Sequence, residues 1–231
     1  MILGVAQVVV NVADLDGAMA TMLAAGYTPA FSELDLANHS AKRSFQAVDR
    51  STLDLVYLSP PAPGPAVELT AYDGPPPRGE TVYTLAAPAP AGTIGGVVVR
   101  AARPAESLAF WTKGLGFAER GPMNGTAALE FPTPVPAWRL PVVLEGDAAS
   151  GGPTAVDAEG CVLVTLLTTD LRRDLANLAE SGLAAAATEV WEESIGGRGL
   201  QLAFVRGPSG ELVELVQLAA PHETNRPWRQ P

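Results

Sequence analysis

One carboxylate interrupts an apolar strand near the carboxyl end of the chain. The segment 199–218 reads GLQLAFVRGPSGELVELVQL, and its two apolar runs flank a turn that contains proline and glycine. Because proline fixes φ and glycine permits the φ values of a tight reversal, the segment predicts a β-hairpin. Alternation along its second strand places Glu214 on the same face as Leu212 and Val216. A buried charge costs several kcal/mol unless it is paired, hydrogen-bonded, metal-bound or in a wet cavity, so Glu214 is the first candidate for chemistry.

Two interpretations of Glu214 are open. Either the carboxylate forms a structural ion pair with Arg198 or Arg206, or it acts on a ligand. The two histidines give weaker signals than this carboxylate. His39 and His222 fall in a predicted loop and in the tail, where a solvated histidine is the default.

The composition excludes several classes of function. With 231 residues, 47% of them hydrophobic and 17% charged, the chain can bury the core of one large or two small domains. A net charge of −10, with only 15 Lys and Arg residues, argues against nucleic-acid binding. Cys161 is the single cysteine, so no intrachain disulfide can form. The first residues lack the basic part of a signal peptide and no apolar run reaches about 18 residues, which predicts a soluble cytoplasmic protein without a membrane partner.

A pattern of strand, helix and further strands occurs three times along the chain. In the first copy we expect a helix at 15–23 and strands at 5–12, 27–34, 45–48, 53–58 and 67–72. In the second we expect a helix at 104–115 and strands at 97–100, 127–131 and 138–144. In the third we expect a helix from 169 to Gly182 and strands at 162–167, 190–194, 200–205 and 212–218.

Three segments interrupt or follow the repeats. Residues 74–92 are rich in proline and glycine and predict a linker that holds one short strand at 82–85. Residues 148–153 predict a shorter connector. The end of the chain, 220–231, has no periodic pattern and predicts a tail, in which we expect Trp228 to pack on the body of the protein or on a partner.

Three pieces of the sequence resemble the vicinal oxygen chelate superfamily, which includes glyoxalase I, extradiol dioxygenases and bleomycin-resistance proteins. They are VNVADLDGAMATMLAAGY, VVVRAARPAESLAFWTKGLGF, and LLTTDLRRDLANLAESG followed by FVRGPSGELVEL. The likeness covers most of residues 4–219. It implies an α+β fold of three βαβββ modules, at 1–73, 93–147 and 160–219, two of them paired into a curved mixed sheet with the ligand on its concave face.

The same resemblance implies a particular pairing of the modules. Residues 93–219 have the length of one complete paired domain, so the first module has no obvious partner in its own chain. A lone open sheet would leave its edges and an apolar face exposed. The resemblance therefore implies either a homodimer in which two first modules pair, or an unusual packing of three modules.

Metal ligands in the superfamily come from the first and last strands of each module. Gln7 occupies the first-strand position of the first module, whereas Gly96 and Leu163 occupy it in the other two. On the closing strands the matching carboxylates are Glu68, Glu214 and, more loosely, Glu145.

A set of metal ligands without imidazole makes a poor site for zinc, nickel or iron. We therefore expect no cofactor. Because some forms of glyoxalase I use a glutamine and a glutamate from one module, the resemblance also leaves open a weakly metal-dependent enzyme, with a divalent metal on Gln7 and Glu68.

Two classes of function remain, and each has a small molecule as its partner. The first is a lyase or isomerase in which Glu214, Glu145 or Glu68 removes a proton next to a carbonyl. The second is a binding protein of the bleomycin-resistance kind, which sequesters an apolar or planar compound. The missing imidazole ligands favour binding or metal-free chemistry. In either class, strand aromatics could supply the ligand-stacking surface: Tyr57, Phe131, Trp138, Trp191 and Phe204.

Overall fold

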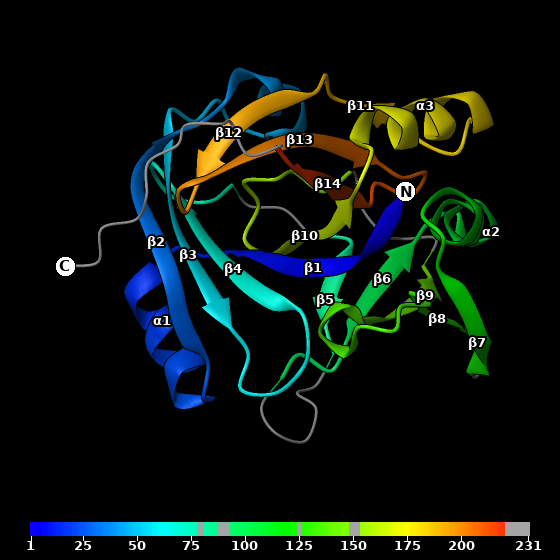
Figure 1. Cartoon of the computed structure of the whole chain (residues 1–231), viewed down its shortest axis with the longest axis horizontal. Helices are drawn as coiled ribbons and strands as arrows, with labels where there is room; N and C mark the ends of the chain where they lie inside the picture. The colour runs from blue at the N-terminus through cyan, green and yellow to red at the C-terminus, as the bar shows by residue number, and fades with distance from the viewer. Residues whose placement is uncertain (78–80, 87–92, 124–125, 148–152, 220–231) are drawn as a thin grey trace.

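A computed structural model shows the three repeats arranged in two sheets (Figure 1). It describes residues 1–77, 81–86, 93–123, 126–147 and 153–219. The predicted tail at 220–231, with Trp228, and most of the predicted connector at 148–153 lie outside these residues.

The first module follows the predicted order of elements. Asp14 caps its helix, because the side chain accepts a hydrogen bond from the Gly17 amide at 3.0 Å. The apolar side of the helix packs on the outer face of the sheet through Ala18, Met19 and Met22. The elements are β1 (Ile2–Asn11), α1 (Leu15–Ala24), β2 (Thr28–Ala37), η1 (Ser40–Phe45), β3 (Thr52–Ser59) and β4 (Ala66–Tyr72).

The third module repeats this arrangement near the end of the chain. Asp170 caps its helix, and Gly182 ends it in the left-handed conformation with φ of 64°. The hairpin predicted at 199–218 is present, with Arg206 opposite Leu212 across the turn. The elements are β10 (Gly160–Thr168), α3 (Leu171–Ser181), β11 (Ala186–Ala187), β12 (Trp191–Ile195), β13 (Arg198–Arg206) and β14 (Leu212–Leu218).

The second module has its own five-stranded sheet, in the order β5-β6-β9-β8-β7. Its first strand on this path is the short strand predicted inside the linker. Its elements are β5 (Tyr83–Leu85), β6 (Val97–Ala101), α2 (Pro104–Ala109), a π-helical turn η2 (Phe110–Gly114), β7 (Ala118–Met123), β8 (Thr126–Glu130), η3 (Pro136–Trp138) and β9 (Pro141–Gly146). None of the helices in the described part of the chain is long and apolar enough to cross a membrane.

The first and third modules share one nine-stranded sheet. Its main path runs β11-β13-β14-β10-β1-β4-β3-β2, and β12 pairs with β13. The central seam is the antiparallel pair of β1 and β10, in which Gln7 lies opposite Thr165. Figure 1 shows the resulting sheet curving around its concave side. The predicted fold class, three modules of which two form a curved mixed sheet, is therefore confirmed.

The prediction that 93–219 forms the complete paired domain is wrong. The third module pairs with the first, because β1 and β10 are long strands whose apolar side chains are buried in the middle of the sheet. The corresponding strand of the second module, β6, has only five residues, and β5 pairs with its free edge. The first module thus has its partner within the chain, which removes the reason for expecting a dimer of two first modules.

Two local predictions also differ from the structure. The segment 45–48 is not a strand: Phe45 ends η1, and the amides of Ala47 and Val48 donate to the carboxylate of Asp157 at 2.7 and 3.1 Å. Those amides are therefore engaged by a side chain and not by a neighbouring strand. Trp138 lies in η3, ahead of its predicted strand, because the strand begins only at Pro141.

A disulfide across the seam tests the pairing of the first and third modules. Val9 and Leu163 lie opposite each other in β1 and β10 and both line the cavity described below. We expect Val9→Cys with Leu163→Cys to oxidise to an intrachain disulfide, because opposed residues of an antiparallel pair lie within disulfide reach. Mass spectrometry under non-reducing conditions would detect it, with Val9→Cys alone as control. A disulfide that joins two chains, or none, would contradict the pairing.

Candidate functional site

The concave face of the nine-stranded sheet encloses a cavity of about 680 Å³. This volume lies within the range of small-molecule sites, about 300–1,000 Å³. Most of the wall is apolar and comes from both paired modules, including Val9, Leu36, Leu55, Leu163, Leu202 and Val216. At the rim the β12–β13 hairpin reaches β2, where the Gly196 amide donates to Glu33 Oε1 at 3.1 Å.

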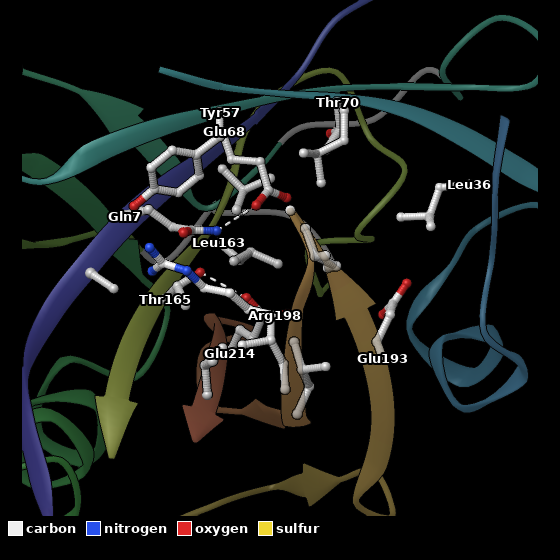
Figure 2. A pocket seen from close by; sticks show the side chains of 18 of the residues that line it. Gln7, Leu36, Tyr57, Glu68, Thr70, Leu163, Thr165, Glu193, Arg198 and Glu214 are labelled. Carbon is white, nitrogen blue, oxygen red and sulfur yellow. Dashed lines mark hydrogen bonds between the residues drawn. The ribbon is translucent and has the colours of Figure 1, made fainter. Parts of the chain in front are cut away.

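Two carboxyl groups face this cavity from the closing strands of the paired modules. Glu68 lies on β4 and is half-buried, and Glu214 lies on β14 and is buried (Figure 2). Gln7 Nε2 donates to Glu68 Oε2 at 2.5 Å, and Thr165 Oγ1 donates to Glu214 Oε2 at 2.8 Å. Since Gln7 and Thr165 are opposite each other in the seam, the seam itself brings the two carboxyl groups to one site.

The cavity changes the protonation of both groups. Burial raises the pKa of Glu68 from 4.5 to about 8, and the charges of Glu214 and Glu193 add to the rise, while Lys42 and the hydrogen bond from Gln7 oppose it. Burial also raises the pKa of Glu214 to about 7, against the lowering effects of Lys42 and the Thr165 hydrogen bond. Near neutral pH the pair therefore retains a proton, and Glu68 is the more strongly protonated member.

A buried ion pair lies beside the two carboxyl groups. Lys42 Nζ is 3.6 Å from Glu193 Oε2, and each of the two side chains is 9% exposed. Trp191 Nε1 donates to the same carboxylate at 3.0 Å, and the Lys42 ammonium lies 5.8 Å from the centre of the Trp191 ring. Sequence reasoning missed Lys42 and Glu193, because a lysine in a predicted loop and a glutamate on a polar strand look like surface residues.

The ion pairs considered for Glu214 do not form in the described structure. Arg206 instead donates to the carbonyl of Thr154 at 2.7 Å and lies 4.7 Å from the centre of the Phe45 ring. Arg198 lies at the rim of the cavity, with its end turned toward Gln7 (Figure 2). The hydrogen-bond partner of Glu214 is Thr165. A hydrogen bond, and not a salt bridge to either arginine, therefore holds the Glu214 carboxylate toward the cavity.

The third predicted carboxylate lies elsewhere. Glu145 is on β9, in the sheet of the second module, where it is exposed and does not line the cavity. The physical reason is the pairing of the modules: β9 belongs to the five-stranded sheet of the second module, whereas β4 and β14 belong to the nine-stranded sheet that forms the cavity. We therefore remove Glu145 from the candidate catalytic set.

Three of the five predicted aromatic residues reach the cavity, namely Tyr57, Trp138 and Phe204. Phe131 instead packs within the second module, with its ring centre 5.4 Å from that of Phe117. Trp191 lies behind the wall, in edge contact with Phe204 at 5.1 Å, so it acts on the cavity through the residues that it contacts, Phe204, Glu193 and Lys42.

The residues at the metal-ligand positions do not fit a divalent transition metal. Gln7, Glu68 and Glu214 come together, but the fourth position is the apolar side chain of Leu163. Within the described ranges, no group of three or more His, Cys, Asp or Glu side chains could hold a metal ion. One amide and two carboxyl groups without imidazole or thiolate form a weak donor set for zinc, nickel or iron.

No protein-family model matches the sequence, and no curated protein matches it either. Among solved structures, the chain is similar to glyoxalase I from Zea mays, with a TM-score of 0.57 and 14% identity over 93% of this chain and 92% of that one. A point mutant of the same enzyme aligns with a TM-score of 0.58 and 15% identity over 93% and 92% of the two chains. The chain therefore has the glyoxalase I fold, that of the vicinal oxygen chelate superfamily which its sequence resembles.

A third similar structure is a glyoxalase/bleomycin resistance protein/dioxygenase from Nocardioides. It aligns with a TM-score of 0.40 and 16% identity, over 63% of this chain and 93% of that one.

The raised pKa of Glu68 predicts a pH-dependent stability. A carboxyl group with a pKa raised in the folded state favours folding most below its ordinary pKa of 4.5, and this advantage is lost as pH rises to about 8. Each pKa unit corresponds to about 1.4 kcal/mol. We expect the thermal midpoint of the wild type to fall over this window and that of Glu68→Gln to fall less, as measured by circular dichroism.

A matched control for this measurement is Glu145→Gln, which replaces an exposed glutamate. We expect its pH dependence to follow the wild type. Equal slopes for the wild type and Glu68→Gln would contradict the burial of an ionisable group at this position.

Proposed function

We propose that this chain is a metal-independent lyase or isomerase that moves a proton next to the carbonyl of a small, largely apolar metabolite. The observation that carries the proposal is the pair of carboxyl groups, Glu68 and Glu214, in one apolar cavity with pKa values of about 8 and about 7. A general acid and a general base work best with pKa values near the operating pH. Two carboxyl groups with different surroundings can divide these roles.

The two groups have distinct parts in the proposed reaction. The Glu214 carboxylate removes a proton from the carbon next to the carbonyl, and the electron pair of the broken C–H bond forms a carbon–carbon double bond. The Glu68 carboxyl group gives its proton to the carbonyl oxygen, which becomes a hydroxyl group. Return of a proton from Glu214 to carbon, and of the hydroxyl proton to Glu68, completes an exchange or an isomerisation without a redox partner.

The neighbours of the two groups support this division. Thr165 orients Glu214 through its hydroxyl group, and Gln7 holds Glu68 through its amide. The apolar wall reduces the water around the reacting atoms, which strengthens each electrostatic contact. Both groups belong to one chain, so the proposed site does not depend on the predicted homodimer, which stays a prediction.

A second function, ligand sequestration without catalysis, is favoured by one observation. Phe31 and Tyr57 line the cavity as a stacked pair, with ring centres 5.0 Å apart and planes at 11°. Such a surface suits a planar apolar compound of the kind that bleomycin-resistance proteins hold. Binding without turnover would identify this function.

Deuterium exchange tests the proposed proton transfer. The probes are phenylacetone and 4-methyl-2-oxopentanoate in D₂O, and proton NMR follows loss of the signal next to the carbonyl. Because a positioned base contributes about 10²–10⁴ in rate, we expect Glu214→Gln to slow exchange at least about 100-fold. Glu145→Gln serves as the control. No exchange above the protein-free rate for either probe, with binding retained, would favour sequestration.

The pH profile of exchange provides a separate test. The rate requires an ionised Glu214 and a protonated Glu68, so it should rise through pH about 7 and fall above about 8. These two values belong to the pair as a whole. We expect Glu68→Gln to lose the falling limb of the profile, and a flat wild-type profile across this range would contradict the assignment.

A further inference from the structure

Among the residues that the structure describes, two cationic side chains line the cavity, Lys42 and Arg198, and a carboxylate lies beside the first. Lys42 is buried and lies 3.6 Å from Glu193, so its charge is balanced within the protein. Arg198 is exposed at the rim, and no ion pair or hydrogen bond joins it to another residue in the described structure. A guanidinium group stays charged at any physiological pH and offers five donors. Arg198 is therefore the cation available to a ligand.

The hairpin that carries Arg198 is fixed over the cavity. Gly196 and Gly197 form its turn with φ of 57° and 72°, and Arg198 follows directly, opposite Ile195. The Gly196 amide is anchored to Glu33, and a Cβ built on Gly196 would lie 3.2 Å from the Phe31 ring. This close packing against β2 holds the start of β13 in place, so Arg198 projects across the rim and not away from it (Figure 2).

The end of the Arg198 side chain lies on the side of the cavity that Tyr57 and Gln7 line. Figure 2 shows it beneath Gln7 and close to the hydroxyl end of Tyr57. Burial and the charge of Glu68 raise the pKa of Tyr57, and the nearby charge of Arg198 opposes that rise. Gln7 in turn is hydrogen-bonded to Glu68. If Arg198 binds the anionic group of a ligand, the ligand atoms bonded to that group would therefore lie at the Glu68 carboxyl group.

We propose that the substrate is a 2-oxo acid with an apolar side chain, whose carboxylate binds Arg198 with help from the Tyr57 hydroxyl group. This inference rests on the proposed function. A carboxylate matches the planar fork of one guanidinium, whereas a phosphate would bring more charge close to Glu214. The carbonyl attached to the carboxylate then lies at Glu68, and the apolar side chain extends along the wall that Leu36 and Leu55 form.

The chemical step for such a substrate is keto–enol tautomerisation. Glu214 takes a proton from C3, and the electron pair of that bond forms the C2–C3 double bond. The carbonyl oxygen takes the proton of Glu68. Atoms and electrons balance within the substrate and the two carboxyl groups, and no oxidant or second reactant is needed.

The test compares 4-methyl-2-oxopentanoate with its methyl ester, which has the same skeleton without the charge. Isothermal titration calorimetry measures binding, and deuterium exchange at C3 measures turnover. We expect the wild type to prefer the acid, and Arg198→Gln to weaken acid binding by about 10-fold to 100-fold, the range of a charge-assisted hydrogen bond. Arg198→Lys should restore part of the preference, because it keeps the charge without the fork.

The control is Arg120→Gln, which removes an exposed arginine paired with Glu130 in the second module and should keep the wild-type preference. Equal binding of acid and ester, or an unchanged preference in Arg198→Gln, would overturn the inference. Exchange of both compounds at equal rates would overturn it while the proposed proton transfer stands. Acid binding that depends on Arg198 without any exchange would support the ligand class and refute the proposed catalysis.

Discussion

The seam between β1 and β10 is the contact on which the site depends. Its antiparallel register sets Gln7 opposite Thr165, and each of these residues hydrogen-bonds the carboxyl group on the closing strand of its own module. The sheets of the first and third modules thereby join into one concave surface. Without the seam, Glu68 and Glu214 would lie on two separate open sheets, and neither would experience the low dielectric that raises its pKa.

Three carboxyl groups among the described residues line the cavity, and the contacts that stabilise them differ. Glu193 is balanced by Lys42 and by the indole of Trp191. Among the described residues, the hydrogen bonds to Glu68 and Glu214 come from neutral donors, an amide and a hydroxyl group, which lower the cost of ionisation without abolishing it. Burial therefore raises the pKa of these two carboxyl groups, and the raised pKa values suit them to proton transfer.

The second module supports the site from outside the shared sheet. Its η3 turn lies against β1, where a Cβ on Gly4 would lie 2.7 Å from Cβ of Trp138, so the glycine permits the approach that brings this tryptophan to the cavity. Its helix α2 is joined to the turn between β13 and β14 by the hydroxyl pair of Ser107 and Ser209, at 2.8 Å. The turn that precedes the strand of Glu214 is thus fixed to the second module.

The sequence alone determined the repeated modules, the capped helices at Asp14 and Asp170 and the carboxylates on closing strands, because these features follow from local periodicity, capping chemistry and turn residues. It could not determine which modules pair, since β1, β6 and β10 all read as apolar strands and their contacts join residues far apart in the chain. Only the tertiary structure therefore excluded Glu145, placed Trp138 in the cavity wall and Trp191 behind Phe204, and gathered Lys42, Glu193 and Arg198 around one cavity. Long-range strand pairing decides which faces of the strands are buried, and the local sequence pattern does not specify that pairing.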